Sequence, residues 1–318
     1  ILSLALHGKK SFDTDRKIDW NALIQMAEKH KVLPFLFDIL QGADLQQEQQ
    51  KILQKKGQQT VQQSYRLLFL SKSIIEELKE YGIDAILLKG SGVAALYPVP
   101  EYRKSGDIDI LMKNKEEAER ACKILEKRGF CKKEYQAAHH HIACSGVDGI
   151  EMELHVTLAE PFDSEKTNTY LKQCQASFFE HRKSQDVMGV TFELAADAYQ
   201  AFYLLLHMLQ HFLRAGFGLK LLCDWVVFWE KPVRKEEKDT FIQLLEGSGL
   251  IGFASIITAV CVKYLQLDRE KVAFLLDRES FDKKTVSSFM KEVCEAERVI
   301  IGGKTNISSN SSDFSLFG

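Results

Sequence analysis

The sequence predicts an α+β fold, with a group of strands in the middle of the chain and helices on either side of it. Residues 83–88 form an apolar run, and residues 107–111 and 150–156 alternate between polar and apolar side chains, as strands with buried faces do. Apolar residues recur at helical spacing before residue 80 and again after residue 195. Because helices and strands do not alternate regularly along the chain, this segregation favours an α+β fold over a doubly wound parallel sheet.

The same patterns divide the chain into four expected segments. They are an N-terminal helical region over 1–80, a strand-containing α/β core over 81–193, a C-terminal helical domain over 194–301 and a disordered, Ser- and Asn-rich tail over 302–318. Asp19 is expected to cap a helix that begins at Trp20. Further helices are expected over 45–63, 65–78, 115–127, 195–229, 241–265 and 283–300.

The composition is that of an ordinary soluble protein. The 318 residues include 45% hydrophobic and 27% charged side chains, and no apolar run is long enough to span a bilayer. The net charge of −2 shows no excess of basic residues, which argues against obligatory binding of nucleic acid. The 7 cysteines include no Cys-x-x-Cys pair, which favours buried thiols in a reducing compartment over disulfides or a zinc cluster. We therefore expect a cytoplasmic protein without membrane contact.

A glycine turn and two aspartates form the most informative part of the sequence. Lys89-Gly90-Ser91 follows the first expected strand, and Asp107 and Asp109 occupy alternate positions of the second. Side chains alternate across a strand, so both carboxylates are expected on one face. Adjacent carboxylates repel each other unless a cation or a proton lies between them, and Mg²⁺ prefers such oxygen ligands. The turn suits phosphate, which backbone N–H groups and the Ser91 hydroxyl can bind.

A third acidic segment follows at residues 150–156. Its alternation places Glu151, Glu153 and His155 on one face of a strand. If this strand pairs beside the aspartate strand, Glu153 completes a site of three carboxylates, with Glu151 as the alternative. A phosphate-binding turn, a carboxylate pair and a third carboxylate are the parts that a two-metal phosphoryl-transfer enzyme requires.

These motifs resemble those of a known group of proteins. The matching residues are Leu88-Lys89-Gly90, Tyr97-Pro98, Arg103, Asp107-Ile108-Asp109 and Glu153-Leu154-His155, with further matches at Trp20, Ala27, His30, His207, His211 and Asp224. The pattern is similar to that of the nucleotidyltransferase superfamily that includes DNA polymerase β. It is more closely similar to an uncharacterised bacterial nucleotidyltransferase-like family of that superfamily.

The resemblance implies a small mixed β-sheet with a helical C-terminal domain, and a reaction that moves NMP from an NTP to a hydroxyl acceptor with release of pyrophosphate. It implies that Asp107 and Asp109 hold two Mg²⁺ or Mn²⁺ ions and that Glu153 holds the ion beside the acceptor. Gly90 and Ser91 would position the triphosphate. From their residue types alone, Lys89 and Arg103 are either cations that steer or neutralise phosphate or a pair of surface cations. The acceptor stays open: a small molecule, a protein hydroxyl or an RNA end.

Three alternatives remain at the level of sequence. The interval between Ser91 and Asp107 is longer than in the usual superfamily pattern, and the third acid is Glu instead of Asp, so a pseudoenzyme that binds nucleotide or protein is possible. Asp107-Ile108-Asp109 also fits the metal-binding Asp-x-Asp of sugar-nucleotide glycosyltransferases. Gly90-Ser91-Gly92 with Ala95 weakly fits a dinucleotide fingerprint.

Two groups of histidines are weaker candidates for metal binding. For His139-His140-His141, structural or solvent-facing roles are favoured, because no cysteine is near and the helical ligand spacing is absent. His207 and His211 share a helical face, but the glutamate of the zinc-protease motif is missing between them. Helix–helix hydrogen bonding or a place beside the nucleotide is therefore favoured over zinc for this pair.

Overall fold

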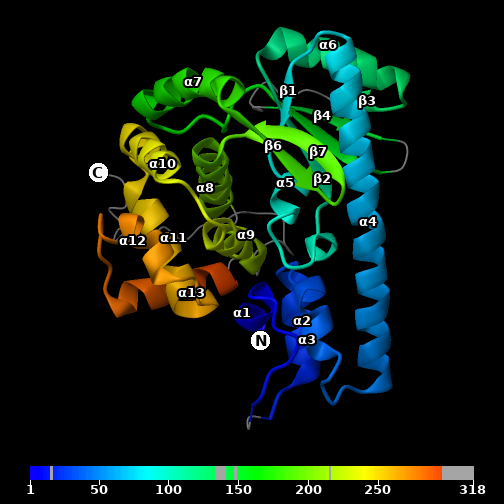
Figure 1. The fold of residues 1–318 in the computed structure, drawn as a ribbon, viewed down its shortest axis with the longest axis vertical. Coiled ribbons are helices and arrows are strands. Elements are labelled where there is room, and N and C mark those ends of the chain that lie inside the picture. The colour runs from blue at the N-terminus through cyan, green and yellow to red at the C-terminus, as the bar shows by residue number, and fades with distance from the viewer. Residues whose placement is uncertain (15–16, 133–140, 147–148, 215, 296–318) are drawn as a thin grey trace. The chain divides into compact units, whose positions relative to one another are not determined.

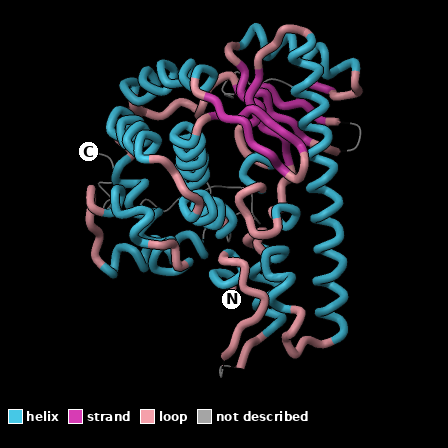
Figure 2. Tube along the Cα trace, in the orientation of Figure 1, coloured by secondary structure: helices cyan, strands magenta, loops and turns pink. Residues whose placement is uncertain are grey.

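The structure, a computed structural model, describes residues 1–14, 17–132, 141–146, 149–214 and 216–295. Its strands all lie between β1 (Ala85–Leu87) and β7 (Val190–Ala195), and helices precede and follow them along the chain. Figure 2 distinguishes the strands from the helices by colour. This arrangement confirms the predicted α+β class. The expected disordered tail over 302–318 and the end of the helix expected over 283–300 lie outside the described residues.

The chain forms two compact units. One is the sheet unit, Gln54–Tyr203; the other is the helical unit, which combines Ile1–Leu53 with the described residues from Leu204 onward. Helices α4 (Gln47–Glu80) and α8 (Asp197–Arg214) each begin in one unit and end in the other. The four segments expected from the sequence remain a prediction about the chain, which limited proteolysis can test.

The sheet unit contains a mixed five-stranded sheet and a separate hairpin. The order in the large sheet is β1-β2-β5-β4-β3, built from β2 (Asp107–Met112), β3 (Cys131–Lys132), β4 (His141–Ser145) and β5 (Glu151–His155). Strands β2 and β5 are parallel, and every other neighbouring pair is antiparallel. The hairpin pairs β6 (Arg182–Val187) with β7. The three strands expected from the sequence are thus present as β1, β2 and β5.

One face of the large sheet is apolar because every second residue along its strands has an apolar side chain that points to that face. The core on this face contains Leu67, Leu68, Ile74 and Leu78 of α4, Ile108, Ile110 and Met112 of β2, Met152 and Leu154 of β5, and Ala118, Ala121, Cys122 and Leu125 of α6 (Lys115–Lys127). Helices α4 and α6 lie beside the strands in Figure 1. Truncating one of the Leu, Ile or Met side chains of this core to Ala is expected to cost about 2–5 kcal/mol. The alternate residues of β2 and β5 consequently lie on the opposite face.

The shorter elements of the sheet unit are α5 (Ser91–Ala94), the 3₁₀ helix η2 (Pro100–Tyr102) and α7 (Glu165–Glu180). Helix α6 has the bounds that its amphipathic pattern predicted, and it begins there because Asn114 Oδ1 accepts a hydrogen bond from the Glu117 backbone N–H. Ser164 caps α7 in the same way, through Thr167 N.

The remaining helices belong to the helical unit. They are α1 (Leu2–Leu6), α2 (Trp20–Lys29), η1 (Leu33–Leu36), α3 (Phe37–Leu40), α9 (Leu219–Glu230), α10 (Lys235–Ser248), α11 (Ile251–Leu265), α12 (Arg269–Leu276) and α13 (Lys283–Glu295). The predicted cap of α2 is confirmed, because Asp19 Oδ1 accepts from Ala22 N. The two helices expected over 45–63 and 65–78 are one continuous helix, α4.

Two of the expected long helices are in fact pairs of helices. The segment 241–265 was expected to be one helix, but Gly249 interrupts it with φ +73°, a left-handed conformation that ends α10. The segment 195–229 is likewise divided into α8 and α9, with Gly216 at φ +74° between them. At Gly249 the physical reason is a glycine with positive φ, which ends a helix even where the apolar pattern continues across it.

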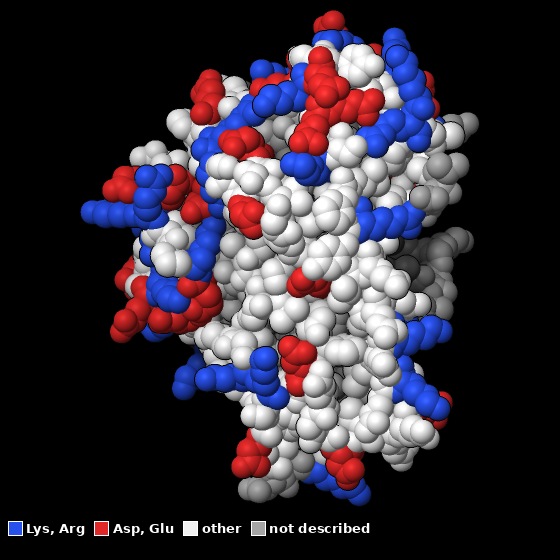
Figure 3. All heavy atoms as spheres, turned by 45° about the vertical axis from the view of Figure 1, so that its right-hand side comes forward, with Lys and Arg blue, Asp and Glu red and all other residues white. Residues whose placement is uncertain are grey.

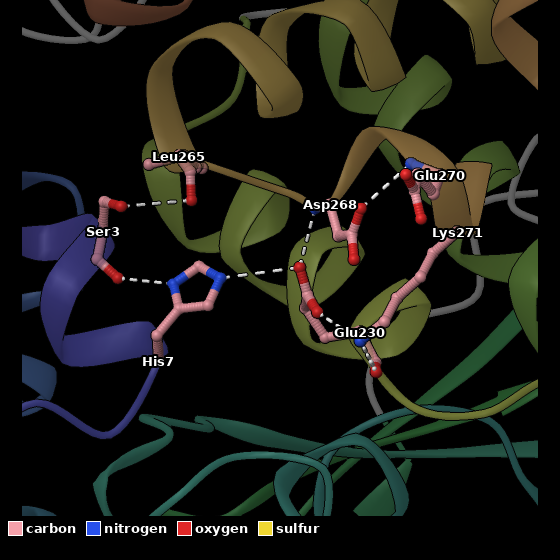
Figure 4. A network of polar contacts seen from close by, with 7 residues as sticks. All are labelled: Ser3, His7, Glu230, Leu265, Asp268, Glu270 and Lys271. Atoms are coloured by element: carbon pink, nitrogen blue, oxygen red, sulfur yellow. Dashed lines mark hydrogen bonds and ion pairs between the residues drawn. The ribbon is translucent and has the colours of Figure 1, made fainter. Parts of the chain in front are cut away.

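A network of polar contacts connects α1 to the ends of α9 and α11 in the helical unit (Figure 4). His7 Nε2 lies 3.5 Å from Glu230 Oε1 at the end of α9, and Ser3 Oγ donates to the Leu265 carbonyl oxygen at the end of α11. Glu230 also accepts from Lys271 Nζ at 2.6 Å and from the Asp268 backbone N–H at 2.8 Å. One carboxylate therefore joins α1, α9 and the start of α12.

No described helix has the length and apolar content to cross a membrane. On the face shown in Figure 3, Lys and Arg side chains are interspersed with Asp and Glu side chains. Mixed signs of this kind agree with the net charge of −2.

Candidate active site

The parallel pairing of β2 with β5 brings the acidic residues together. In its register, Asp107 lies opposite Glu151 and Asp109 lies opposite Glu153. All four residues alternate with core residues, so they lie on the sheet face that α4 and α6 do not cover. Asp107, Asp109 and Glu153 each place a carboxylate oxygen within 4.8 Å of the other two. We call these three residues the carboxylate cluster.

Glu151 has a different environment, although it lies on the same face of β5. Its Oε1 accepts a hydrogen bond from Ser145 Oγ of β4 at 3.0 Å. Glu151 is not part of the carboxylate cluster among the described residues, whereas Glu153 is. Of the two glutamates that the sequence offered as the third acid, the structure thus places Glu153 beside the aspartates.

Lys89 lies against the aspartates. Its Nζ is 3.1 Å from Asp109 Oδ1 and 3.8 Å from Asp107 Oδ2, and its side chain is only 12% exposed. Burial alone would lower the pKa of Lys89, but the carboxylates of Asp109, Asp107 and Glu153 outweigh burial and raise it. The ammonium therefore stays charged and acts as the counter-ion of the pair.

His155 joins the two strands of the cluster. Its Nε2 lies 3.0 Å from Asp109 Oδ1 and 3.2 Å from Glu153 Oε2, and the ring is buried. Burial would lower the pKa of His155, but both carboxylates raise it. Burial in turn favours a higher pKa for Glu153, yet His155, His141 and Lys89 lower that pKa to about 2.

Asp109 is the most buried acid of the cluster, with a side chain that is 0% exposed. Burial favours a raised pKa, but Lys89 and His155 hold the pKa of Asp109 below its ordinary value. Its Oδ1 contacts both partners, while its Oδ2 has no hydrogen-bond partner among the described residues. A buried carboxylate oxygen without a partner is costly, and a bound cation would satisfy it.

Two aromatic neighbours complete this face of the sheet. His141 of β4 pairs with His155 across the strands, with ring centroids 5.3 Å apart, and its Nε2 lies 3.8 Å from Glu153 Oε1. The ring of Tyr203 meets that of His155 edge to face at 6.3 Å. Burial and the nearby carboxylates of Asp109 and Glu153 raise the pKa of Tyr203 well above its ordinary value, so its hydroxyl keeps its proton.

The sequence analysis favoured a structural or solvent-facing role for His141 and did not single out Tyr203. Strand alternation did put His155 on the acidic face, but the pairing of β4 with β5 is needed to bring in His141. His139 and His140, the other members of the histidine tract, lie outside the described residues. Tyr203 belongs to an apolar helix, where nothing in the local pattern separates it from core residues.

The glycine turn lies between β1 and α5. Gly90 has φ +69°, which favours glycine, and Leu88 N donates to the Asp109 carbonyl oxygen at 3.0 Å. Ser91 begins α5 and is buried. The turn is therefore anchored to the aspartate strand.

Arg103 stabilises this turn through hydrogen bonds. Its guanidinium is buried, and Nη1 donates to the Gly90 carbonyl oxygen at 3.2 Å and to Ser105 Oγ at 2.7 Å. The predicted contact of Arg103 with phosphate stays a prediction; the contacts present fix the conformation of Gly90.

The surroundings of Gly92 explain why a second glycine occurs two residues after Gly90. A Cβ at this position would lie 2.9 Å from Leu194 Cδ1, and Gln185 Nε2 donates to the Gly92 carbonyl oxygen at 3.1 Å. Close approach of the hairpin explains this glycine. The dinucleotide alternative does not fit, because β1 and β2 are antiparallel, whereas that fold requires parallel strands joined through a helix.

A cavity of about 740 Å³ lies elsewhere in the sheet unit. Lys113, Asn114 and Val156 line it, and these residues follow the last residues of β2 and β5. Asp107, by contrast, is the first residue of β2. The cavity is therefore at the opposite end of the strands, and none of the carboxylate cluster lines it.

The remaining candidates from the sequence belong to the helical unit. The rings of His207 and His211 on α8 meet edge to face, with centroids 4.5 Å apart. Asp224 on α9 is buried. Their predicted structural roles, and the prediction that the pair holds no zinc, stay predictions.

Comparison with known proteins assigns the chain to a family. Residues 16–266 match the family described as "Uncharacterised nucleotidyltransferase". No curated protein matches the chain. The chain is also similar to a solved structure, an antigenic nucleotidyltransferase-like protein from Paracoccidioides brasiliensis, at 15% sequence identity and a TM-score of 0.36. That similarity covers 63% of this chain and 92% of the other.

Proposed function

Because the chain belongs to the family of uncharacterised nucleotidyltransferases, we propose that it transfers NMP from an NTP to a hydroxyl acceptor and releases pyrophosphate. The observation that carries this proposal is the carboxylate cluster of Asp107, Asp109 and Glu153, assembled by the parallel pairing of β2 with β5. The match to the family supports the reaction class, and the cluster supplies residues that fit it.

The cluster fits a hard divalent cation such as Mg²⁺ or Mn²⁺. It offers oxygen ligands only, and the buried Asp109 Oδ2 lacks a hydrogen-bond partner among the described residues. Asp107 and Asp109 would hold metal together with the triphosphate, and Glu153 would hold metal beside the acceptor. Such ions, when bound, lower the pKa of the acceptor hydroxyl and neutralise charge on the phosphates.

Lys89 supplies the site with a positive charge that can change its partner. In the structure its ammonium neutralises the aspartates. The flexible stem of Lys89 would allow its ammonium to turn from the aspartates toward the triphosphate when the carboxylates hold a divalent cation, since like charges repel. Lys89 would thus neutralise the carboxylates before substrate binds and the phosphates afterwards.

The turn would position the triphosphate. Ser91, the first residue of α5, offers a hydroxyl and a backbone N–H, and Gly90 before it has a positive φ of +69°. Arg103 acts through Gly90, because its hydrogen bond holds the carbonyl oxygen of that residue. His155 contacts both Asp109 and Glu153, so it orients the two carboxylates relative to each other.

The finer assignments belong to this proposal as well. We place the family in the superfamily of DNA polymerase β, and we expect a bacterial, cytoplasmic enzyme whose acceptor is a small molecule, a protein hydroxyl or an RNA end. These statements rest on the resemblance of the motifs and on the composition.

The test is incubation with each labelled NTP and Mg²⁺ over a panel of acceptors, with release of pyrophosphate as the readout. We expect turnover that the double variant Asp107→Asn, Asp109→Asn abolishes while far-UV circular dichroism stays unchanged. Asp163→Asn, an exposed aspartate of the same unit, is the matched control and should keep full activity. Turnover that survives the double substitution would exclude the cluster as the active site.

The contacts of Lys89 also favour a second candidate function, that of a pseudoenzyme that binds nucleotide without transferring it. Its ammonium already neutralises the aspartates, so the cluster has a counter-ion without any metal. This function predicts NTP binding that needs neither Mg²⁺ nor Glu153, with no pyrophosphate released from any acceptor. Calorimetry with and without Mg²⁺ separates the two functions.

A further inference from the structure

A second group of potential metal ligands adjoins the carboxylate cluster. His141, Glu153 and His155 each place a ligand atom within 4.8 Å of the other two. His141 Nε2 lies 3.8 Å from Glu153 Oε1, and His155 Nε2 lies 3.2 Å from Glu153 Oε2. Ligands bound at about 2.0–2.1 Å in a tetrahedral zinc site are roughly 3.4 Å apart, so these separations need only small adjustments.

We infer that His141, Glu153 and His155 form a binding site for a transition-metal ion of the zinc class, distinct from the oxygen-only site of the aspartates. Two imidazole nitrogens and one carboxylate are the ligands of many catalytic zinc ions, and they leave a position open for water or substrate. Imidazole selects zinc and related ions, whereas the aspartates suit Mg²⁺ or Mn²⁺.

The register of the sheet preforms this arrangement. His141 and His155 are direct partners in the β4–β5 ladder, and Glu153 is the residue two before His155 on the same face of β5. Neighbouring strands therefore set the spacing of all three ligands, without any flexible loop. The site is also accessible, because the side chains of His141 and Glu153 are 16% and 30% exposed.

Glu153 belongs to both groups, so its two oxygens can bridge two ions of different kinds. One ion would have oxygen ligands from Asp107 and Asp109, and the other would have nitrogen ligands from the histidines. The presence of this site does not depend on the proposed transfer reaction. Its role there, which rests on the proposed function, would be to supply the ion beside the acceptor.

The test uses Co²⁺ and Zn²⁺ alone, without nucleotide, on the full chain. We expect one Co²⁺ with the visible absorption of a four- or five-coordinate ion, displaced by Zn²⁺. His141→Gln should weaken this binding at least about 100-fold, because it removes a direct ligand and even indirect partners are worth 10–100-fold. His141→Cys should restore Zn²⁺ binding, since a thiolate is also a zinc ligand.

Three matched variants define the location of the ion. Asp107→Asn should keep the Co²⁺ spectrum, because Asp107 is not among the three ligands. His181→Gln controls for the loss of a histidine from the same unit. His207→Gln breaks the other adjacent histidine pair, so it excludes adventitious binding there.

The outcomes are decisive in either direction. Absence of a bound ion, binding that His141→Gln leaves unchanged, or binding lost in Asp107→Asn or His207→Gln would each overturn the inference. Because His141 is only partly buried, its substitution should leave the fold intact, which far-UV circular dichroism checks. Failure of the proposed transferase function would appear as absent pyrophosphate release and would leave the Co²⁺ result unaffected.

Discussion

Lys89 Nζ lies 3.1 Å from Asp109 Oδ1, so an ammonium that is only 12% exposed supplies the counter-charge of a buried carboxylate. The pair links the glycine turn to the aspartate strand. It also means that any cation entering the cluster competes with Lys89 for the same oxygen.

This competition leads to the first prediction. Lys89→Met should lower the free energy of unfolding by about 3 kcal/mol without metal, because it leaves the buried Asp109 with His155 as its remaining cationic partner. Mg²⁺ should raise the melting temperature of the variant more than that of the wild type, since the ion replaces the missing charge. Thermal unfolding followed by circular dichroism, with and without MgCl₂, measures both effects.

Lys113→Met is the control for that experiment. Lys113 pairs with Asp84 at 3.1 Å, but its side chain is 46% exposed. Loss of such a surface pair should cost less than about 1 kcal/mol and create no response to Mg²⁺. A Lys89→Met protein as stable as the wild type would show that the buried pair contributes little.

The second prediction concerns Ser91. Ser91→Ala should weaken binding of NTP by roughly 1.5–3 kcal/mol, the value of a hydrogen bond to a charged group, and should weaken binding of NMP much less. Calorimetry with both ligands measures the difference. An equal loss for both would assign Ser91 to the fold of the turn instead of to the triphosphate.

The third prediction separates the two glutamates of β5. Glu153→Gln should leave the affinity for NTP nearly intact and remove most turnover, because the ion beside the acceptor loses a ligand that matters in the transition state. Glu151→Gln is the matched control, and it should retain turnover because Glu151 bonds to Ser145 outside the cluster. Greater damage from Glu151→Gln would reverse the assignment.

The fourth prediction concerns Glu230 and pH. Burial would raise the pKa of this carboxyl, but Lys271, the backbone N–H of Asp268 and His7 lower it below the ordinary 4.5. Because the folded pKa is depressed, the stabilisation is present above pH 4.5 and is lost as pH falls through the folded pKa. Glu230→Gln should therefore cost about 1 kcal/mol at neutral pH, after allowance for solvent screening, and less in acid.

Tryptophan fluorescence is the appropriate probe for that measurement. The 3 tryptophans, Trp20, Trp225 and Trp229, all belong to the helical unit, which contains Glu230. Urea unfolding of both proteins at several pH values gives the free energies. A difference between them that does not shrink in acid would show that the carboxylate charge is not what stabilises the network.

The alternation of polar and apolar residues along strands was sufficient to predict part of the site. Alternation along a strand put Asp107 and Asp109 on one face and grouped Glu153 with Glu151 and His155 on one face of another strand, and the amphipathic pattern predicted the bounds of α6. These features depend on neighbours in sequence. The contact of His141 with Glu153 depends on the pairing of β4 with β5, which no local pattern contains.

Lys89 illustrates a second limit. Its place after a strand and before a glycine turn suggested phosphate as its partner. The structure shows that a buried aspartate is its partner, because a carboxylate removed from water requires a counter-charge. Sequence identified the residue, but burial decides which anion it contacts.

The parallel pairing of β2 with β5 has a consequence for the order of folding. A hairpin forms from adjacent segments, but parallel neighbours require a long crossover, here through α6, β3 and β4. The aspartates are synthesised well before Glu153, His155 and His141 can reach them, and closing such a non-local contact is slow. Competence to bind metal should therefore appear late in refolding, after α6 has formed. A chain that ends before β5 would contain both aspartates and yet have no complete site.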